Sequence, residues 1–116
     1  MKAPAPTERA IQIAIKDRLT FHGCLVAHVP NAAKRSAVAG RRVKQEGMIT
    51  GFPDLLVYRA GKHALLEVKR PGYSPSAVSA SQRDVHAALA RQGFTVAIVT
   101  SQDEAVQTLR AAGWAL

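Results

Sequence analysis

Residues 51–70, GFPDLLVYRAGKHALLEVKR, constrain the fold of this chain more than any other stretch. Two apolar runs flank the pair Ala60-Gly61, a pattern that predicts two antiparallel strands joined by a short turn. With the turn centred on this pair, residues whose numbers sum to 121 face each other, so Asp54 lies opposite Glu67. Directly opposed side chains have Cβ atoms roughly 4.5–5.5 Å apart, and like charges so placed repel. A largely apolar hairpin is therefore predicted to hold two carboxylates together.

The two faces of this hairpin differ in character. Lys69 lies two residues from Glu67 and therefore shares its face. Two interpretations fit this polar face equally well: a divalent cation, Mg²⁺ or Mn²⁺ completed by waters, relieves the repulsion, or Lys69 alone balances both acids in a salt-bridged cluster. The opposite face consists of residues typical of a protein core, namely Leu55, Val57, Ala64, Leu66 and Val68.

The net charge of the chain points to a polyanionic partner. Sixteen Lys and Arg against eight Asp and Glu give a formal charge of +8 and a pI near 10.4. Nucleic acid is the simplest partner for such an excess, although charge speaks to association and not to chemistry, and a basic protein without such a partner is the alternative.

The positive charge is concentrated in a segment without acidic residues that runs from Arg18 to Gln45. Lys and Arg side chains neutralise phosphates and release counterions, so this segment is predicted to contact DNA, unless it is merely a solvated basic loop. No aromatic residue is interleaved with the charges of AKRSAVAGRRVK, residues 33–44, which gives no indication of base stacking. The candidate phosphate-binding residues are Lys34, Arg35, Arg41, Arg42 and Lys44.

Length and composition favour one cytoplasmic domain. A chain of 116 residues fits a single domain, 1–116, in which residues 1–6 are expected to form a flexible tail. No run of 18 apolar residues predicts a membrane span, and the N-terminus lacks the apolar centre of a signal peptide. The single Cys24 cannot form an internal disulfide, which suits a reducing cytoplasm.

Capping residues and apolar periodicity predict the remaining elements. Thr7 is a candidate cap for a first helix, Ser81 with Asp84 approximates a capping box for a second, and Ser101 with Glu104 forms one for a third. The predicted order α-β-β-β-α-β-α indicates an α/β fold with a mixed sheet flanked by helices. In chain order we expect a helix over 8–22, a strand over 24–29, an irregular stretch over 31–50 with a short helix near 37–46, the hairpin strands, a helix over 81–92, a strand over 94–100 and a helix ending before Gly113.

Several motifs carry a family resemblance. Pro53-Asp54 followed by Glu67-Val68-Lys69 resembles the PD-(D/E)XK nuclease signature. The segments TERAIQIAI, VPNAAKR, EGMITGFPDLLVY, LLEVKRPG, SQRDVHAAL and VAIVTSQDEA, in that order, are similar to the VRR-NUC family of virus-type replication-repair nucleases. The resemblance covers about residues 7–109. It implies a restriction-endonuclease-like core, metal-dependent cleavage of DNA phosphodiester bonds, and, as in phage and bacterial members, homodimers that cut branched DNA such as four-way (Holliday) junctions in DNA repair.

The resemblance assigns roles to the hairpin residues. Asp54 and Glu67 match the metal-binding acids, with the backbone carbonyl of Val68 as a further oxygen ligand. Lys69 matches the catalytic lysine, which either orients the attacking water or stabilises charge at phosphorus.

Three residues outside the hairpin also match. Glu8 matches a first-helix glutamate and a possible metal ligand, although an acid in the first helical turn also suits the helix dipole. Gln82 matches a glutamine that follows the catalytic lysine, and its alternative is a polar residue without consequence. Asn31, in VPN, either contacts phosphate or shapes its loop.

Other functions and residues receive less support. A nuclease-fold module that binds DNA without cutting, and a general or sequence-specific metal-dependent nuclease, are the alternatives to a branched-DNA endonuclease. No histidine shows ligand spacing to Cys24 or to another histidine, so none is predicted to bind metal. Trp114 is expected either to pack internally or, with the apolar side of the last helix, to anchor a dimer.

Overall fold

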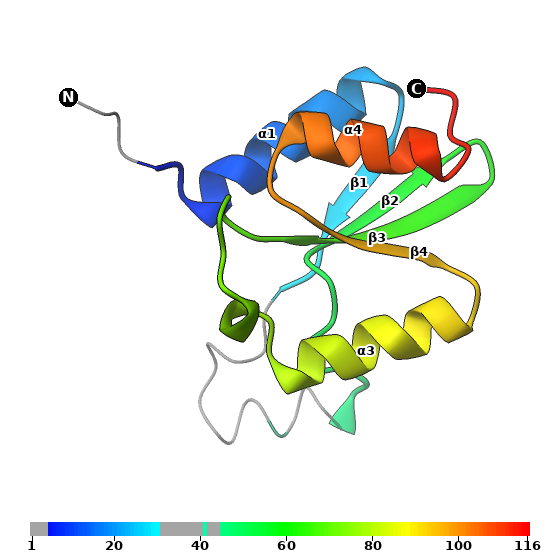
Figure 1. The fold of residues 1–116 in the computed structure, drawn as a ribbon. Coiled ribbons are helices and arrows are strands. Elements are labelled where there is room, and N and C mark those ends of the chain that lie inside the picture. Colours follow the sequence, from blue (N-terminus) through cyan, green and yellow to red (C-terminus); the bar gives the residue numbers. More distant parts are fainter. Residues whose placement is uncertain (1–4, 31–40, 42–44) are drawn as a thin grey trace.

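The computed structural model describes residues 5–30, 41 and 45–116 (Figure 1). The predicted order of helices and strands is confirmed within this part of the chain, with one short 3-10 helix added. In chain order the elements are α1 (Glu8–Phe21), β1 (Leu25–His28), β2 (Leu55–Arg59), β3 (Lys62–Val68), η2 (Pro75–Ala77), α3 (Ala80–Arg91), β4 (Thr95–Val99) and α4 (Gln102–Ala111).

The described strands form one mixed sheet in the order β1-β2-β3-β4. β1 and β3 each run antiparallel to β2, whereas β4 runs parallel to β3. The hairpin register agrees with the prediction, because Leu55 pairs with Leu66 and Arg59 pairs with Lys62. Ala60 and Gly61 both have positive φ angles, 51° and 79°, as a tight two-residue hairpin turn requires.

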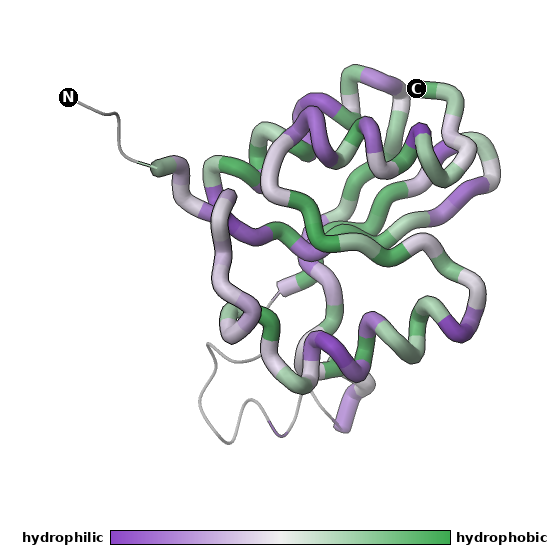
Figure 2. The backbone as a smooth tube through the Cα atoms, in the orientation of Figure 1, coloured by the Kyte–Doolittle hydropathy of each residue, from purple (hydrophilic) through white to green (hydrophobic). Residues whose placement is uncertain are grey.

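Helices cover both faces of the sheet, and the main core lies on one side. α1 and α4 pack together over one face, and α3 lies over the other (Figure 1). The core joins Ile11, Ile15 and Leu19 of α1 to the apolar face of the hairpin that the sequence predicts. Figure 2 shows this hydrophobic layer along the strands. No side chain of α3 is fully buried, so the two faces of the sheet are packed unequally.

Capping of α1 follows the prediction closely. The Thr7 hydroxyl accepts a hydrogen bond from the Ala10 N–H at 3.0 Å, which satisfies one of the helix's free donors. The helix ends at Phe21, one residue earlier than expected, and Gly23 follows in the left-handed region at φ 85°. These signals place the first turn of α1, with Glu8, near the end of β3.

The predicted capping residue of α3 is wrong by two residues, and the helix starts at Ala80, one residue earlier than expected. Ser79, not Ser81, caps the helix: its hydroxyl accepts from the Gln82 N–H at 3.1 Å, and the Gln82 side chain accepts from the Ser79 N–H at 2.9 Å. The sequence SASQRD contains two overlapping capping patterns, and the structure uses the first. This choice turns Gln82 into the third residue of the helix, where its side chain reaches back toward the sheet.

The last helix begins where predicted, but its apolar side does not form a surface. Ser101 caps α4 by accepting from the Glu104 N–H at 3.0 Å. Val106 and Leu109 are buried in the core, together with Trp114, which is 5% exposed. The expectation that Trp114 and this helix face supply a dimer contact is therefore wrong, and internal packing is confirmed.

Much of the predicted basic segment lies outside the described residues. Asn31, Lys34, Arg35, Arg42 and Lys44 fall there, as does most of the short helix expected near 37–46. Arg41 is described and is exposed. Among the helices that the structure describes, none is long and apolar enough to cross a membrane.

Candidate functional site

Asp54 lies at the point where the hairpin ladder ends. The last paired residues there are Leu55 and Leu66, so the register places Asp54 opposite Glu67 as predicted. The Val68 N–H, which has no strand partner at this position, donates a 2.8 Å hydrogen bond to Oδ2 of Asp54. The acid therefore caps the ladder with its side chain, and this contact fixes one of its two oxygens.

Glu67 and Lys69 are charged residues inside the protein, 3% and 7% exposed. Burial of charges is costly unless they are paired or hydrogen-bonded. Lys69 Nζ lies 2.7 Å from the Ala77 carbonyl oxygen, but 3.9 Å from Glu67 Oε2. The short contact of the ammonium is thus with a neutral oxygen, and its ion pair with Glu67 is long.

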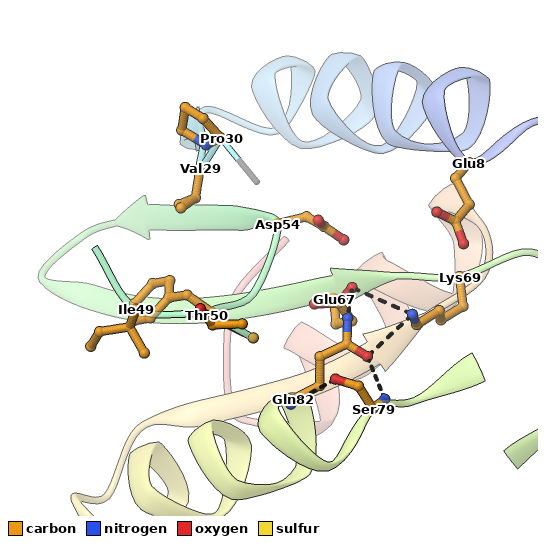
Figure 3. Close-up of a pocket in the computed structure, with 12 residues that line it drawn as sticks. Glu8, Val29, Pro30, Ile49, Thr50, Asp54, Glu67, Lys69, Ser79 and Gln82 are labelled. Carbon is orange, nitrogen blue, oxygen red and sulfur yellow. Dashed lines mark hydrogen bonds and ion pairs between the residues drawn. The ribbon is translucent and has the colours of Figure 1, made fainter. Parts of the chain in front are cut away.

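Gln82 links these two buried charges to the start of α3. Its Nε2 donates to Glu67 Oε2 at 3.2 Å, while its Oε1 accepts from Lys69 Nζ at 3.3 Å (Figure 3). The same Oε1 accepts the Ser79 N–H of the capping box. Gln82, the second residue of the capping box, therefore also holds Glu67 and Lys69 in place.

His86 belongs to the same cluster, although sequence reasoning missed it. It lies one helical turn after Gln82, and its Nε2 is 3.9 Å from Glu67 Oε1. Neither atom has a hydrogen-bond partner among the described residues, and both are buried. The signal in the sequence is the i, i+4 spacing of His86 from Gln82, which places both residues on one face of the helix.

The electrostatics of the site disfavour two ionised acids. The pKa of Asp54 is raised from 3.8 to about 6, chiefly by burial and in addition by the neighbouring Glu67 carboxyl group. The hydrogen bond from Val68 and the charge of Lys69 act in the opposite direction without cancelling this effect on the pKa. Lys69 alone therefore does not balance the acid pair, which argues against the salt-bridged cluster as a complete explanation.

A cleft of about 220 Å³ opens above these residues. Asp54, Glu67, Lys69 and Gln82 line it, and Glu8 reaches it from the first turn of α1 (Figure 3). Glu8 itself is exposed. All five predicted side chains of the site are thus brought together, from α1, from the residue before β2, from β3 and the residue after it, and from α3.

Gly51 sets the wall of this cleft against α3. A Cβ atom at this position would come within 2.5 Å of the Ser81 carbonyl carbon and 2.7 Å of the Gln82 nitrogen. Its φ of 85° also lies in the region that glycine adopts most readily. Thr50 and Gly51 line the same cleft as Glu67 and Gln82.

The donor set suits a hard divalent cation. Glu67 Oε1 is a buried oxygen without a hydrogen-bond partner in the described residues, next to a second carboxylate of raised pKa. The N–H and carbonyl of one strand residue point to the same side, so the Val68 carbonyl faces the side on which Asp54 lies. Within the described residues no three His, Cys, Asp or Glu side chains form a metal-binding group, so carbonyl and water oxygens would complete the coordination.

Comparison with known proteins identifies the family. The family model described as VRR-NUC domain matches residues 6–103. The chain belongs to the VRR-NUC family. The matched region contains every candidate residue of the cleft, and the family implies a nuclease fold of the PD-(D/E)XK superfamily.

Solved VRR-NUC structures share the fold. A structure titled "VRR_NUC domain" matches with a TM-score of 0.64 and 25% identity over 89% of this chain and 94% of that one. Another, titled "VRR_NUC domain protein", gives a TM-score of 0.70 with 19% identity over 92% of this chain and 88% of the other. No curated protein sequence matches significantly. VRR-NUC nucleases generally use divalent metals and act on DNA, which agrees with the donor set and the net charge.

Proposed function

We propose that this VRR-NUC protein is a Mg²⁺- or Mn²⁺-dependent endodeoxyribonuclease that cuts branched DNA, such as four-way junctions, as a homodimer of single-domain chains. The observation that carries the proposal is the buried Glu67 carboxylate, whose Oε1 has no hydrogen-bond partner in the described residues, in a cleft that Asp54 and Lys69 also line. A buried carboxylate pair that its own lysine does not neutralise needs a cation, and a phosphate ester needs one for hydrolysis.

Asp54, Glu67 and the Val68 carbonyl would hold the metal ion, with Glu8 close enough to the cleft to reach it through water. The bound cation would lower the pKa of a water molecule and withdraw charge from the scissile phosphate. The chain's own residues define where this happens. Asp54 is anchored by the Val68 N–H, and Glu67 is oriented by Gln82.

Lys69 supplies the positive charge beside the reacting phosphate. Its Nζ is held at 2.7 Å by the Ala77 carbonyl and at 3.3 Å by Gln82 Oε1, so the ammonium is positioned before any substrate arrives. A fixed ammonium stabilises the charge that develops on a non-bridging phosphate oxygen, or orients the attacking water. Because it is mostly buried, this lysine needs no reorganisation during the reaction.

A dimer follows from the geometry of the substrate. The described part of the chain holds one such cleft, so one binding event is expected to cut one strand. Two symmetric cuts in a four-way junction require two clefts at fixed separation, and a two-fold homodimer provides them with one self-complementary surface. The basic residues Lys34, Arg35, Arg41, Arg42 and Lys44, with Asn31, are proposed to hold the DNA backbone nearby.

The test is cleavage of labelled four-way junction, flap, single-stranded and linear duplex DNA with Mg²⁺, Mn²⁺ or EDTA, together with light scattering. We expect paired cuts in the junction, none in EDTA, and a dimeric mass. Binding without cleavage in either metal would indicate a DNA-binding module instead. A monomer that cuts linear duplex equally well would leave a general nuclease.

A further inference from the structure

Beyond the metal cleft, the structure contains a groove between α1 and the outer strands of the sheet. A second hollow of about 620 Å³ shares Glu8, Pro30 and Asp54 with the metal cleft. A third, of about 230 Å³, shares Gln12, Ile13 and His28 with the second. The three hollows are therefore neighbours: Asp54 lines both the first and the second, and Gln12 and His28 line both the second and the third.

The α1 wall of this groove repeats at helical spacing. Arg9, Gln12 and Lys16 lie three and four residues apart, so they share one side of the helix. His28 of β1 forms the facing wall, and its Nδ1 lies 3.1 Å from Gln12 Nε2 across the groove. Val26 and Leu55 line the third hollow with apolar side chains.

The charge of the groove changes sign along its length. Its two acidic lining residues, Glu8 and Asp54, lie where it meets the metal cleft. Beyond them come the guanidinium of Arg9 and the ammonium of Lys16, which also pairs with Asp17 at 2.6 Å, with the amide of Gln12 and the imidazole of His28 between them. At one end the carboxylates could bind a metal ion that contacts one DNA phosphate. At the other end the cationic side chains could contact further phosphates of the same strand.

We propose that this groove carries the cleaved DNA strand away from the metal site, with Arg9 and Lys16 contacting two different phosphates on the same side of the cut. This inference rests on the proposed nuclease function and extends it to the path of the strand. From Glu8 to Lys16 the helix rises roughly 12 Å, the axial length of about three to four phosphates of one strand of B-DNA. Ile13, an apolar side chain that is 42% exposed, suits contact with deoxyribose.

The first experiment measures the salt dependence of binding to a four-way junction in a Glu67→Gln background, which prevents cutting. Arg9→Gln and Lys16→Gln should each reduce the slope of log K against log salt by up to about 0.9, and affinity at 0.1 M salt by up to about eightfold. Arg91→Gln is the matched control, because it removes the same charge from the far end of α3. Thermal melts confirm that each variant is folded.

The second experiment tests which phosphate Arg9 and Lys16 each contact. Single neutral methylphosphonates are placed at each of the four positions on either side of the cut. We expect lost affinity at positions on one side only, with Arg9→Gln abolishing the effect at one position and Lys16→Gln at another farther from the cut. Persistence of every effect in both variants, or slopes that change no more than in Arg91→Gln, would overturn the proposal.

The two proposals fail in different ways. DNA that is bound but never cut, with reduced slopes for the Arg9 and Lys16 variants, would refute the nuclease function and keep the groove as a backbone-binding surface. Paired cuts by the wild-type protein, with slopes unchanged in both variants, would refute the groove and keep the nuclease.

Discussion

The seven residues of β3 point alternately to the two faces of the sheet, and these two faces have different roles. On one face, Ala64, Leu66 and Val68 pack under α1 and α4 in the main core. On the other, Leu65 and Glu67 lie under α3, none of whose side chains is fully buried. The first face stabilises the fold by apolar burial. The second holds a carboxylate whose oxygen Oε1 lacks a partner among the described residues, which costs stability.

This difference shows how the fold keeps two repelling carboxylates next to each other. Close packing on the α1 side fixes the register of the hairpin, and a shift by one residue would turn the core residues outward. That fixed register holds Asp54 opposite Glu67 despite their repulsion. The polar face thus depends on the apolar face for its geometry, whereas the apolar face needs nothing from the polar one.

The largest expected effect is loss of cleavage on removing either acid. Asp54→Asn and Glu67→Gln each remove a ligand charge but almost no volume. Cleavage should fall by more than roughly 100-fold, the upper end for losing an outer-shell partner of a metal. DNA binding should persist. Gel assays of cleavage and binding check this, and wild-type cleavage rates in either variant would show that the site is misassigned.

The apolar face should respond in stability where the polar face responds in activity. Leu66→Ala should lower the free energy of unfolding by about 4 kcal/mol, because its cavity is enclosed by the core. Leu65→Ala, beneath the thinly packed α3, should cost about 2 kcal/mol, since the helix can settle into the space. Urea unfolding measures both. Equal costs would mean that the two faces are packed alike.

Gln82 tests the link between α3 and the buried charges. Gln82→Ala should reduce cleavage roughly 10- to 100-fold, because Glu67 loses its amide donor and Lys69 an acceptor. Ser79→Ala is the control: it removes the helix cap at a cost of about 1 kcal/mol but touches neither charge. If both variants lose cleavage equally, Gln82 acts only through the helix.

The smallest expected effect is a pH-dependent gain in the stability of Asp54→Asn relative to the wild type. The folded-state pKa of Asp54, about 6, exceeds its ordinary 3.8, so folding favours the protonated acid. The stability from this preference is complete below pH 3.8 and is lost as pH rises through 6. Asp54→Asn does not titrate. In EDTA, the melting temperature of Asp54→Asn relative to that of the wild type should therefore increase from pH 4 to 6.5. Above pH 6.5 this difference should stay constant. A constant difference would contradict the raised pKa.

The sequence predicts the hairpin, its register and the acid pair, because Ala60-Gly61 and the alternating faces are local signals. It does not decide where α3 begins. Ser79 with Gln82 and Ser81 with Asp84 are both acceptable caps, and only the contact of Gln82 with Glu67 and Lys69, residues distant in sequence, selects the first. His86 was missed for the same reason: its partner lies on β3.

Trp114 is another residue whose environment the sequence alone does not predict. Near the end of a chain, a tryptophan fits an interface as well as a core. The structure places it beside Leu109, whose carbonyl accepts the Trp114 N–H at 3.0 Å after α4 ends. That backbone turn carries the side chain into the core, and no local pattern in the sequence predicts its direction.

The most direct test of the central claim, that the polar face of β3 is a divalent cation site, is calorimetric titration of the DNA-free protein with Mn²⁺. The wild-type chain should bind Mn²⁺, Glu67→Gln should lose that binding, and Leu65→Ala should retain it. Equal Mn²⁺ affinity in the wild type and in Glu67→Gln would contradict the account.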